Sequence, residues 1–258
     1  MTNVARKFEA ELASRDIPYS IMDDGRYELS VNDAKLTVSI DNILRDFGRD
    51  RDLSAISRFV EAVLDELNFQ TPRWENVRTL VRYSLEPTDY TAGFADVVHN
   101  VINEDLVQIY VFSSPDCSRI SWISPSVVSD WGISIHELKS QADSNMSQLV
   151  ENAHLETQDV DGNLLGMIST EFTEFKSSLV LSYSFRNLVE ATLGWPVLAV
   201  LPCRDFAYVV RCDNQKILSR LGRVVIDEYN KSGYPITKDV LKISDDGIIA
   251  IGTFPDPE

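Results

Sequence analysis

The stretch that decides the fold runs from Val197 to Tyr229 and reads VLAVLPCRDFAYVVRCDNQKILSRLGRVVIDEY. Its first half holds two apolar runs, 197–201 and 206–211, separated by Pro202, and this pattern predicts two successive strands. Its second half repeats apolar residues at three- and four-residue intervals from Ile217 onward, which is typical of one helical face. Because strand follows strand without a helix between them, the stretch favours an α+β fold with mixed or mostly antiparallel sheets and packed helices.

The amino-terminal part of the chain predicts a smaller unit of the same class. Residues 2–15 place apolar side chains four apart, which predicts a helix. After Asp52 as a helix cap, apolar residues recur at helical spacing as far as Leu67. Three strands are expected between these helices, at residues 17–22, 27–31 and 35–40, with Asp24-Gly25 as a tight turn. We therefore expect a helix, three-strand, helix unit over residues 1–72 and a larger α+β body over residues 73–258, unless both belong to one continuous domain.

Outside these two regions the sequence predicts further short strands and helices. Ser134 precedes Glu137 by three residues, which is the capping box of a helix start. Asp161-Gly162 and Asp246-Gly247 each lie between short apolar segments and predict hairpin turns. The expected strands span residues 77–85, 107–112, 120–123 and 179–183, and the expected helices span residues 95–102, 134–150 and 187–193.

Negative charge is concentrated in the middle of the chain. The formal net charge is −16, and residues 83–175 hold fifteen Asp and Glu against only Arg119 and Lys139. The segments 83–118 and 140–175 contain no Lys or Arg, so ion pairs within them are impossible. A field of one sign attracts basic partners and repels DNA, RNA and anionic lipid. The alternative is that the acidic surface only keeps the protein dispersed.

Other features exclude whole classes of protein. No apolar run approaches the roughly eighteen residues that a membrane span needs, and residues 1–16 mix charged with apolar side chains, unlike a secretion signal. We therefore expect a cytoplasmic protein. The three cysteines, Cys117, Cys203 and Cys212, lack C-x-x-C spacing, which argues against a disulfide framework and a zinc knuckle.

Several residues of the carboxy-terminal half occur in a recognisable order. Trp131-Gly132-Ile133-Ser134 precedes Glu137-Leu138, Ala142 and Asn145, and Ala199-Val200-Leu201-Pro202-Cys203-Arg204-Asp205 precedes Pro235-Ile236-Thr237. In this order and rough spacing, residues 107–243 resemble the YtpQ-like proteins, a bacterial family described as a domain of unknown function. Tyr183-Ser184-Phe185-Arg186 departs from that family, in which a stretch containing Gly and Asp is expected. The resemblance implies a cytosolic bacterial α+β protein and brings no established activity.

No motif in the chain predicts a metal or a cofactor. The histidines His99, His136 and His154 lie far apart in the acidic segment, without the H-E-x-x-H spacing of a metal site. The stretch 159–163, DVDGN, lacks the third oxygen ligand and the distant Glu of a calcium loop. The glycines form neither G-x-G-x-x-G nor G-x-x-x-x-G-K, so no phosphate-binding loop is expected.

Two hypotheses for the function remain. The first is a non-enzymatic binding protein, similar in role to an immunity protein or a secretion chaperone, whose acidic face engages a basic protein partner. That face would include the carboxylates of Glu104, Asp105, Glu151, Glu156, Asp159 and Asp161. The alternative is an enzyme of unknown class whose site is assembled from His136, Arg204 and Asp205. Neither hypothesis involves a nucleic acid or a membrane as partner.

Overall fold

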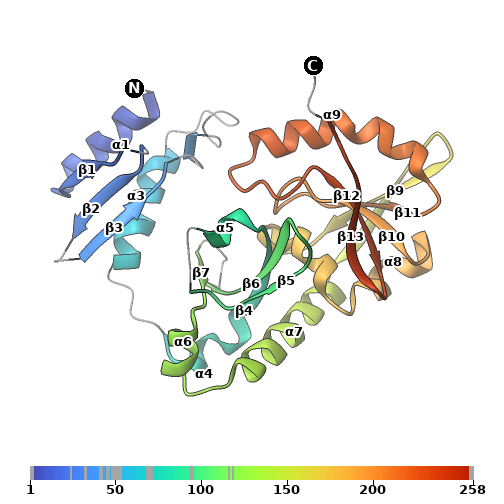
Figure 1. The fold of residues 1–258 in the computed structure, drawn as a ribbon, viewed down its shortest axis with the longest axis horizontal. Coiled ribbons are helices and arrows are strands. Elements are labelled where there is room, and N and C mark those ends of the chain that lie inside the picture. The colour runs from blue at the N-terminus through green and yellow to red at the C-terminus, as the bar shows by residue number, and fades with distance from the viewer. Residues whose placement is uncertain are drawn as a thin grey trace. The chain divides into compact units, whose positions relative to one another are not determined.

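The chain divides into two compact units. The smaller unit is formed by residues 1–71 with 230–234, and the larger by residues 72–229 with 235–258 (Figure 1). The computed structural model describes residues 3–23, 25–31, 34–40, 43, 44, 47, 54–67, 72–92, 96–115, 117 and 119–255. Among these residues, no helix has both the length and the apolar character needed to cross a bilayer.

In its described residues, the smaller unit combines a three-stranded antiparallel sheet with helices. Its elements are α1 (Asn3–Ser14), β1 (Tyr19–Ile21), β2 (Tyr27–Val31), β3 (Ala34–Val38) and α3 (Ser54–Leu67), and its sheet order is β1-β2-β3. One core joins the helices to the sheet and includes Phe8, Leu29 and Ile56. Among the described residues, these elements follow the expected order of helix, three strands and helix. Asp24 and Asp52, expected as turn and cap, lie outside the described residues. The expected unit over residues 1–72 stays a prediction.

A four-stranded antiparallel sheet begins the larger unit. Its strands are β4 (Val81–Pro87), β5 (His99–Val101), β6 (Leu106–Ser113) and β7 (Ile120–Trp122), in the order β4-β6-β5 with β7 also paired to β6. Short helical segments surround it: α4 (Trp74–Val77), η1 (Arg78–Leu80), α5 (Asp89–Ala92) and α6 (Pro125–Asp130). Helix α7 (Ile135–Glu151) packs against β4. The Ser134 hydroxyl accepts a hydrogen bond from the Glu137 N–H at the start of α7, as the capping box predicts.

A six-stranded antiparallel sheet completes the larger unit. Its strands are β8 (His154–Val160), β9 (Asn163–Ser169), β10 (Val197–Val200), β11 (Tyr208–Arg211), β12 (Asp239–Ser244) and β13 (Gly247–Thr253), in the order β13-β12-β10-β11-β9-β8. The fold-deciding hairpin β10–β11 lies at its centre. Asp161-Gly162 and Asp246-Gly247 form the β8–β9 and β12–β13 turns, and the positive φ of Gly162 (80°) and Gly247 (110°) explains why glycine occurs there.

Helices cover both faces of the six-stranded sheet. Leu221 and Val225 of α9 (Gln215–Lys231) pack against Leu198 on one face. Helix α8 (Phe185–Leu193) approaches the other face, where a Cβ added at Gly166 would lie 3.0 Å from the Leu193 side chain. Two 3-10 segments, η2 (Thr173–Phe175) and η3 (Ser177–Leu181), precede α8. All strand pairs in the described residues are antiparallel, so the α+β prediction is confirmed.

Three segments differ from the sequence prediction. Residues 99–101, expected within a helix, form β5 because they pair with 107–109 of β6. Residues 179–181, expected as a strand, belong to η3, and the Ser178 hydroxyl in that segment accepts a hydrogen bond from the Leu85 N–H of edge strand β4. Residues 77–80, expected as the start of a strand, lie at the end of α4 and in η1. The β5–β6 pairing and the hydrogen bond between Ser178 and Leu85 join residues that are apart in the chain, so a local sequence pattern does not predict them.

Candidate functional site

Two adjoining pockets in the larger unit form the candidate site. The polar pocket has a volume of about 690 Å³ and is lined by Asn100, Gln108, Tyr110, His136, Lys139, Ser140, Asp143, Ser144, Leu181 and Tyr183. The apolar pocket has a volume of about 460 Å³ and is lined by Val101, Ile102, Val180, Leu181, Ser182, Tyr183, Arg186, Trp195, Ile243, Ser244, Asp245, Gly247 and Ile248. The two pockets share Leu181 and Tyr183, and Tyr183 is 76% exposed. It is the most exposed large apolar side chain in the described part of the chain.

Strands and a helix position the polar pocket. Asn100 lies on β5, and Gln108, its register partner, lies on β6. Lys139 and Asp143 lie one turn apart on α7, so their side chains share a helix face. The sequence produces this juxtaposition because β6 pairs with β5 and α7 packs on the same sheet.

A chain of hydrogen bonds runs through the polar pocket. The Lys139 ammonium donates to Asn100 Oδ1 at 2.6 Å. The Asn100 amide then donates to Gln108 Oε1 at 2.9 Å and to the Tyr110 hydroxyl at 3.0 Å. The Lys139 Nζ also lies 5.5 Å from the centre of the Tyr110 ring, within cation–π range. Both amide protons of Asn100 are thereby used, and its oxygen binds Lys139, so Asn100 connects the three side chains around it.

Burial perturbs the titratable groups of this pocket. It raises the pKa of Asp143 above the ordinary value, although the nearby Lys139 charge acts in the opposite direction. Burial, with help from the Asp143 charge, raises the pKa of Tyr110 to about 12. The pKa of the buried Tyr83, which packs edge-on against Tyr110, is raised for the same reasons. Both tyrosines are therefore neutral hydroxyl groups at physiological pH.

The opposite face of the four-stranded sheet carries a closed polar cluster. Leu85 is the register partner of Gln108, so the next residue, Glu86, points away from the polar pocket. Its side chain is 1% exposed, and its Oε1 lies 2.7 Å from Arg204 Nη2. The Ser84 hydroxyl donates to the same carboxylate. This cluster joins β4 to the loop between β10 and β11, and its burial indicates a structural role.

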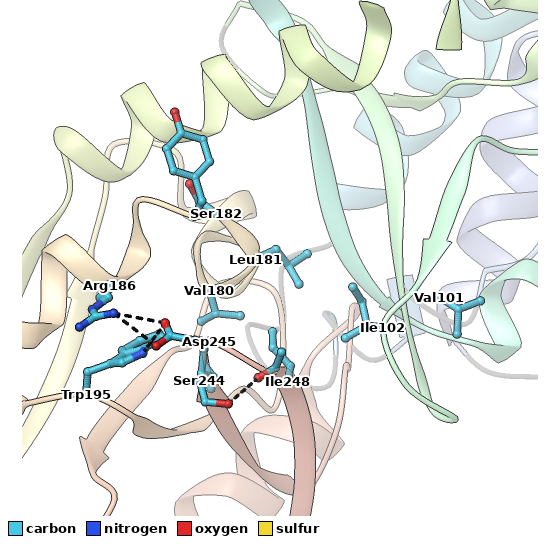
Figure 2. Close-up of a pocket in the computed structure, with 13 residues that line it drawn as sticks. Val101, Ile102, Val180, Leu181, Ser182, Arg186, Trp195, Ser244, Asp245 and Ile248 are labelled. Atoms are coloured by element: carbon cyan, nitrogen blue, oxygen red, sulfur yellow. Dashed lines mark hydrogen bonds and ion pairs between the residues drawn. The ribbon is translucent and has the colours of Figure 1, made fainter. Parts of the chain in front are cut away.

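The apolar pocket has one polar end. Figure 2 shows Arg186, Trp195 and Asp245 gathered there, with Val101 and Ile102 on the opposite side. Asp245 accepts hydrogen bonds from the Trp195 indole at 3.0 Å and from Arg186 Nη1 at 3.3 Å. Arg186 also pairs with Glu190 at 2.6 Å, so its charge is already neutralised within the protein.

The six carboxylates predicted for partner binding are all exposed, and they lie in two groups. The first acidic group, Glu104 and Asp105, lies in the β5–β6 turn directly after the pocket residue Ile102. The second acidic group lies at the end of α7 and on the β8–β9 hairpin, and consists of Glu151, Glu156, Asp159 and Asp161. Along α7, the distance from His136 to Glu151 corresponds to about 22 Å.

The second acidic group is partly engaged inside the protein. Asp161 forms an ion pair with Arg220 of α9. Asp159 Oδ1 accepts a hydrogen bond from the Gly162 N–H at 2.7 Å and so stabilises the hairpin turn. Part of this negative charge is therefore neutralised by a cation from outside the acidic segment.

The residues of the alternative enzyme hypothesis do not meet. His136 lines the polar pocket, whereas Arg204 binds Glu86 on the other face of the sheet. Asp205 accepts a hydrogen bond from the Cys203 thiol at 3.1 Å, and Cys203 is buried. A site built from His136, Arg204 and Asp205 is therefore not assembled in this fold.

Sequence reasoning missed the polar pocket. In the sequence, Lys139 stands out only as one of two cations in the acidic segment, and Asn100, Tyr110 and Asp143 carry no motif. The available signal was the isolation of Lys139, because a lone cation among carboxylates is unusual. The hydrogen bond from Lys139 to Asn100 could not be predicted without knowing that β5 pairs with β6.

Neither a metal-ligand cluster nor a comparison with known proteins assigns a function to these pockets. Within the described residues, no group of three or more His, Cys, Asp or Glu side chains is placed to hold a metal ion. No protein-family model matches the chain, and no curated protein and no solved structure matches it significantly. The resemblance to the YtpQ-like proteins therefore stays a prediction.

Proposed function

We propose that this protein is a non-enzymatic binding protein that engages a basic protein partner along the two adjoining pockets. The observation that carries the proposal is the exposure of Tyr183, 76%, between the two pockets. An aromatic side chain that is left exposed beside concave, partly apolar surfaces is typical of an anchor for a partner. Val101, which lines the apolar pocket and is 69% exposed, extends the same surface.

The charge beside these pockets favours a basic partner. Arg186 and Lys139 already bind acceptors inside the protein. Within the described residues, Glu104, Asp105 and Asp246 form no ion pair and remain available to lysine or arginine side chains. These carboxylates would steer a basic surface toward Tyr183, as expected of an immunity protein or a secretion chaperone.

Affinity capture from the source cell at low and high salt tests this function. A basic protein should be retained at low salt and released as salt rises, because exposed charges are screened beyond about 10 Å at roughly 0.1 M salt. Tyr183→Ser should weaken the affinity of that purified partner about tenfold or more, as for an anchor residue. Tyr234→Ser, which removes another exposed tyrosine, is the matched control.

Charge reversal distinguishes the two acidic groups. Replacing Glu104 and Asp105 with lysine should slow association with the partner and reduce its salt dependence. The matched control reverses Glu151 and Glu156 in the second acidic group, and it should have the smaller effect. A neutral partner whose binding resists salt would contradict the proposed function.

A further inference from the structure

Within the described residues, the polar pocket presents hydrogen-bond donors whose capacity is only partly used or unused. The Tyr110 hydroxyl accepts a hydrogen bond from the Asn100 amide, so its own O–H can donate elsewhere. Gln108 uses only its Oε1 in the network, which leaves its amide protons available. Lys139 donates one of three protons to Asn100. In the described part of the chain, no other side chain takes up these donors.

The same pocket presents a carboxylate that accepts no hydrogen bond. Asp143 lines the pocket and is half-buried, yet among the described residues no group donates to its side chain. Lys139 lies one helical turn away and is directed to Asn100, so the two charges do not pair directly. A cation and an anion thus line one pocket while each keeps unused bonding capacity.

We infer that the polar pocket binds a small zwitterion, of which an α-amino acid is the simplest example. Its carboxylate would accept hydrogen bonds from Lys139, Tyr110 and Gln108, and its ammonium group would donate to Asp143. Charge-assisted hydrogen bonds of this kind are the stronger class in proteins. A volume of about 690 Å³ leaves room for an amino-acid side chain or for a second residue.

This inference is independent of the basic partner. The partner is held by exposed charges and by Tyr183, whereas the zwitterion is held by groups inside the pocket. Binding of the zwitterion should therefore depend little on salt, because pairs that are partly buried are screened less than exposed ones.

Calorimetry and thermal-shift measurements on the full chain test the inference with defined probes. The probes are the free L-amino acids, dipeptides, and the N-acetyl and amide derivatives of any amino acid that binds. At least one free amino acid or dipeptide should bind and raise the melting temperature. Blocking either charged end should weaken binding roughly tenfold or more. Free amino acids and dipeptides distinguish a metabolite from a peptide as the source of the ligand.

Three variants assign the roles of the lining residues. Lys139→Met should reduce affinity for the free probe and leave the affinity for its amide unchanged. Asp143→Asn should make the free and the N-acetyl probe bind equally. Tyr110→Phe keeps the packing of the ring and should cost a roughly threefold to tenfold loss of affinity. Lys242→Met and Asp130→Asn, which change the same charges outside the pocket, are the matched controls.

Two outcomes would overturn the inference. One is the absence of a calorimetric signal for every free amino acid and dipeptide at concentrations on the order of 1 mM, where even weak ligands bind. The other is a probe whose affinity is unchanged in both Lys139→Met and Tyr110→Phe while circular dichroism confirms that the variants are folded. Because the inference does not depend on the partner, it would still hold if Tyr183→Ser lost partner binding but retained zwitterion binding.

Discussion

The two faces of the four-stranded sheet differ in how their charged side chains are buried and paired. On one face, Glu86 is 1% exposed and is held by Arg204 and Ser84. On the other face, Lys139 and Asp143 line an open pocket and do not pair directly. Both faces carry a cation and a carboxylate, and they differ in burial and in whether those two charges pair.

The difference shows how burial separates a structural role from a binding role. A carboxylate withdrawn from water must find a charged partner and hydrogen bonds, or folding becomes costly. A half-buried carboxylate can remain without a partner because water still reaches it. The open face thus keeps bonding capacity for a ligand, whereas on the closed face Glu86 Oε1 binds Arg204 and Ser84 and joins β4 to the β10–β11 loop.

The largest expected effect comes from breaking the closed face. Arg204→Met would leave the Glu86 carboxylate buried without its cation, so we expect a loss of about 3–5 kcal/mol in the free energy of unfolding. Urea unfolding followed by circular dichroism measures this change. The double variant Glu86→Gln with Arg204→Met should recover much of the loss, because no uncompensated charge remains. An Arg204→Met variant as stable as the natural chain would contradict the structural role of this pair.

On the open face, we expect removal of the Asp143 charge to change the free energy of unfolding by a smaller amount and in the stabilising direction. Because burial raises the pKa of Asp143, the folded protein holds this proton more tightly than the unfolded chain does. This contribution to stability is present at low pH and is lost as the pH rises through the folded pKa. Asp143→Asn should therefore be at least as stable as the natural chain near pH 7, and the difference should shrink toward about pH 4.

The measurement is the free energy of unfolding of both chains across this pH range. Asp130→Asn, an exposed carboxylate of α6, controls for the general loss of one negative charge. Lower stability of Asp143→Asn at neutral pH would show that Lys139 stabilises the carboxylate more than burial penalises it, and it would remove the contrast between the two faces.

The smallest effect is expected at the exposed pair of the second acidic group. Arg220 and Asp161 are 57% and 69% exposed. Exposed pairs of this kind contribute about 0–1 kcal/mol, and salt weakens them further. Arg220→Ala should therefore change the urea midpoint only slightly, and the change should vanish at high salt. If Arg220→Ala lost as much stability as Arg204→Met, the difference in exposure between the two ion pairs would not explain their contributions.

Local patterns in the sequence predicted much of the fold. The apolar spacing of Ile217 to Tyr229 became α9, and the Ser134 hydroxyl caps α7. The Asp161-Gly162 turn joins β8 to β9 because glycine tolerates the positive φ that the hairpin requires. These features depend on residues close together in the chain, so a reading of the sequence can reach them.

For the candidate site, the sequence indicated only single residues and not how they come together. The charge count indicated an acidic segment with one isolated lysine, Lys139. It did not indicate that Asn100 would take up that lysine, or that Asp143 would remain without a hydrogen bond. His136 of the alternative enzyme hypothesis lines the polar pocket, whereas Arg204 and Asp205 lie elsewhere in the fold.

By itself, therefore, the sequence determined the composition, the excess of negative charge, the turns and most of the helices and strands. The tertiary structure alone decided which charges are buried and which are open. The physical reason is that β4 alternates its side chains between two faces, so neighbours such as Leu85 and Glu86 enter different environments. The partners in those environments, Gln108 and Arg204, come from distant parts of the chain.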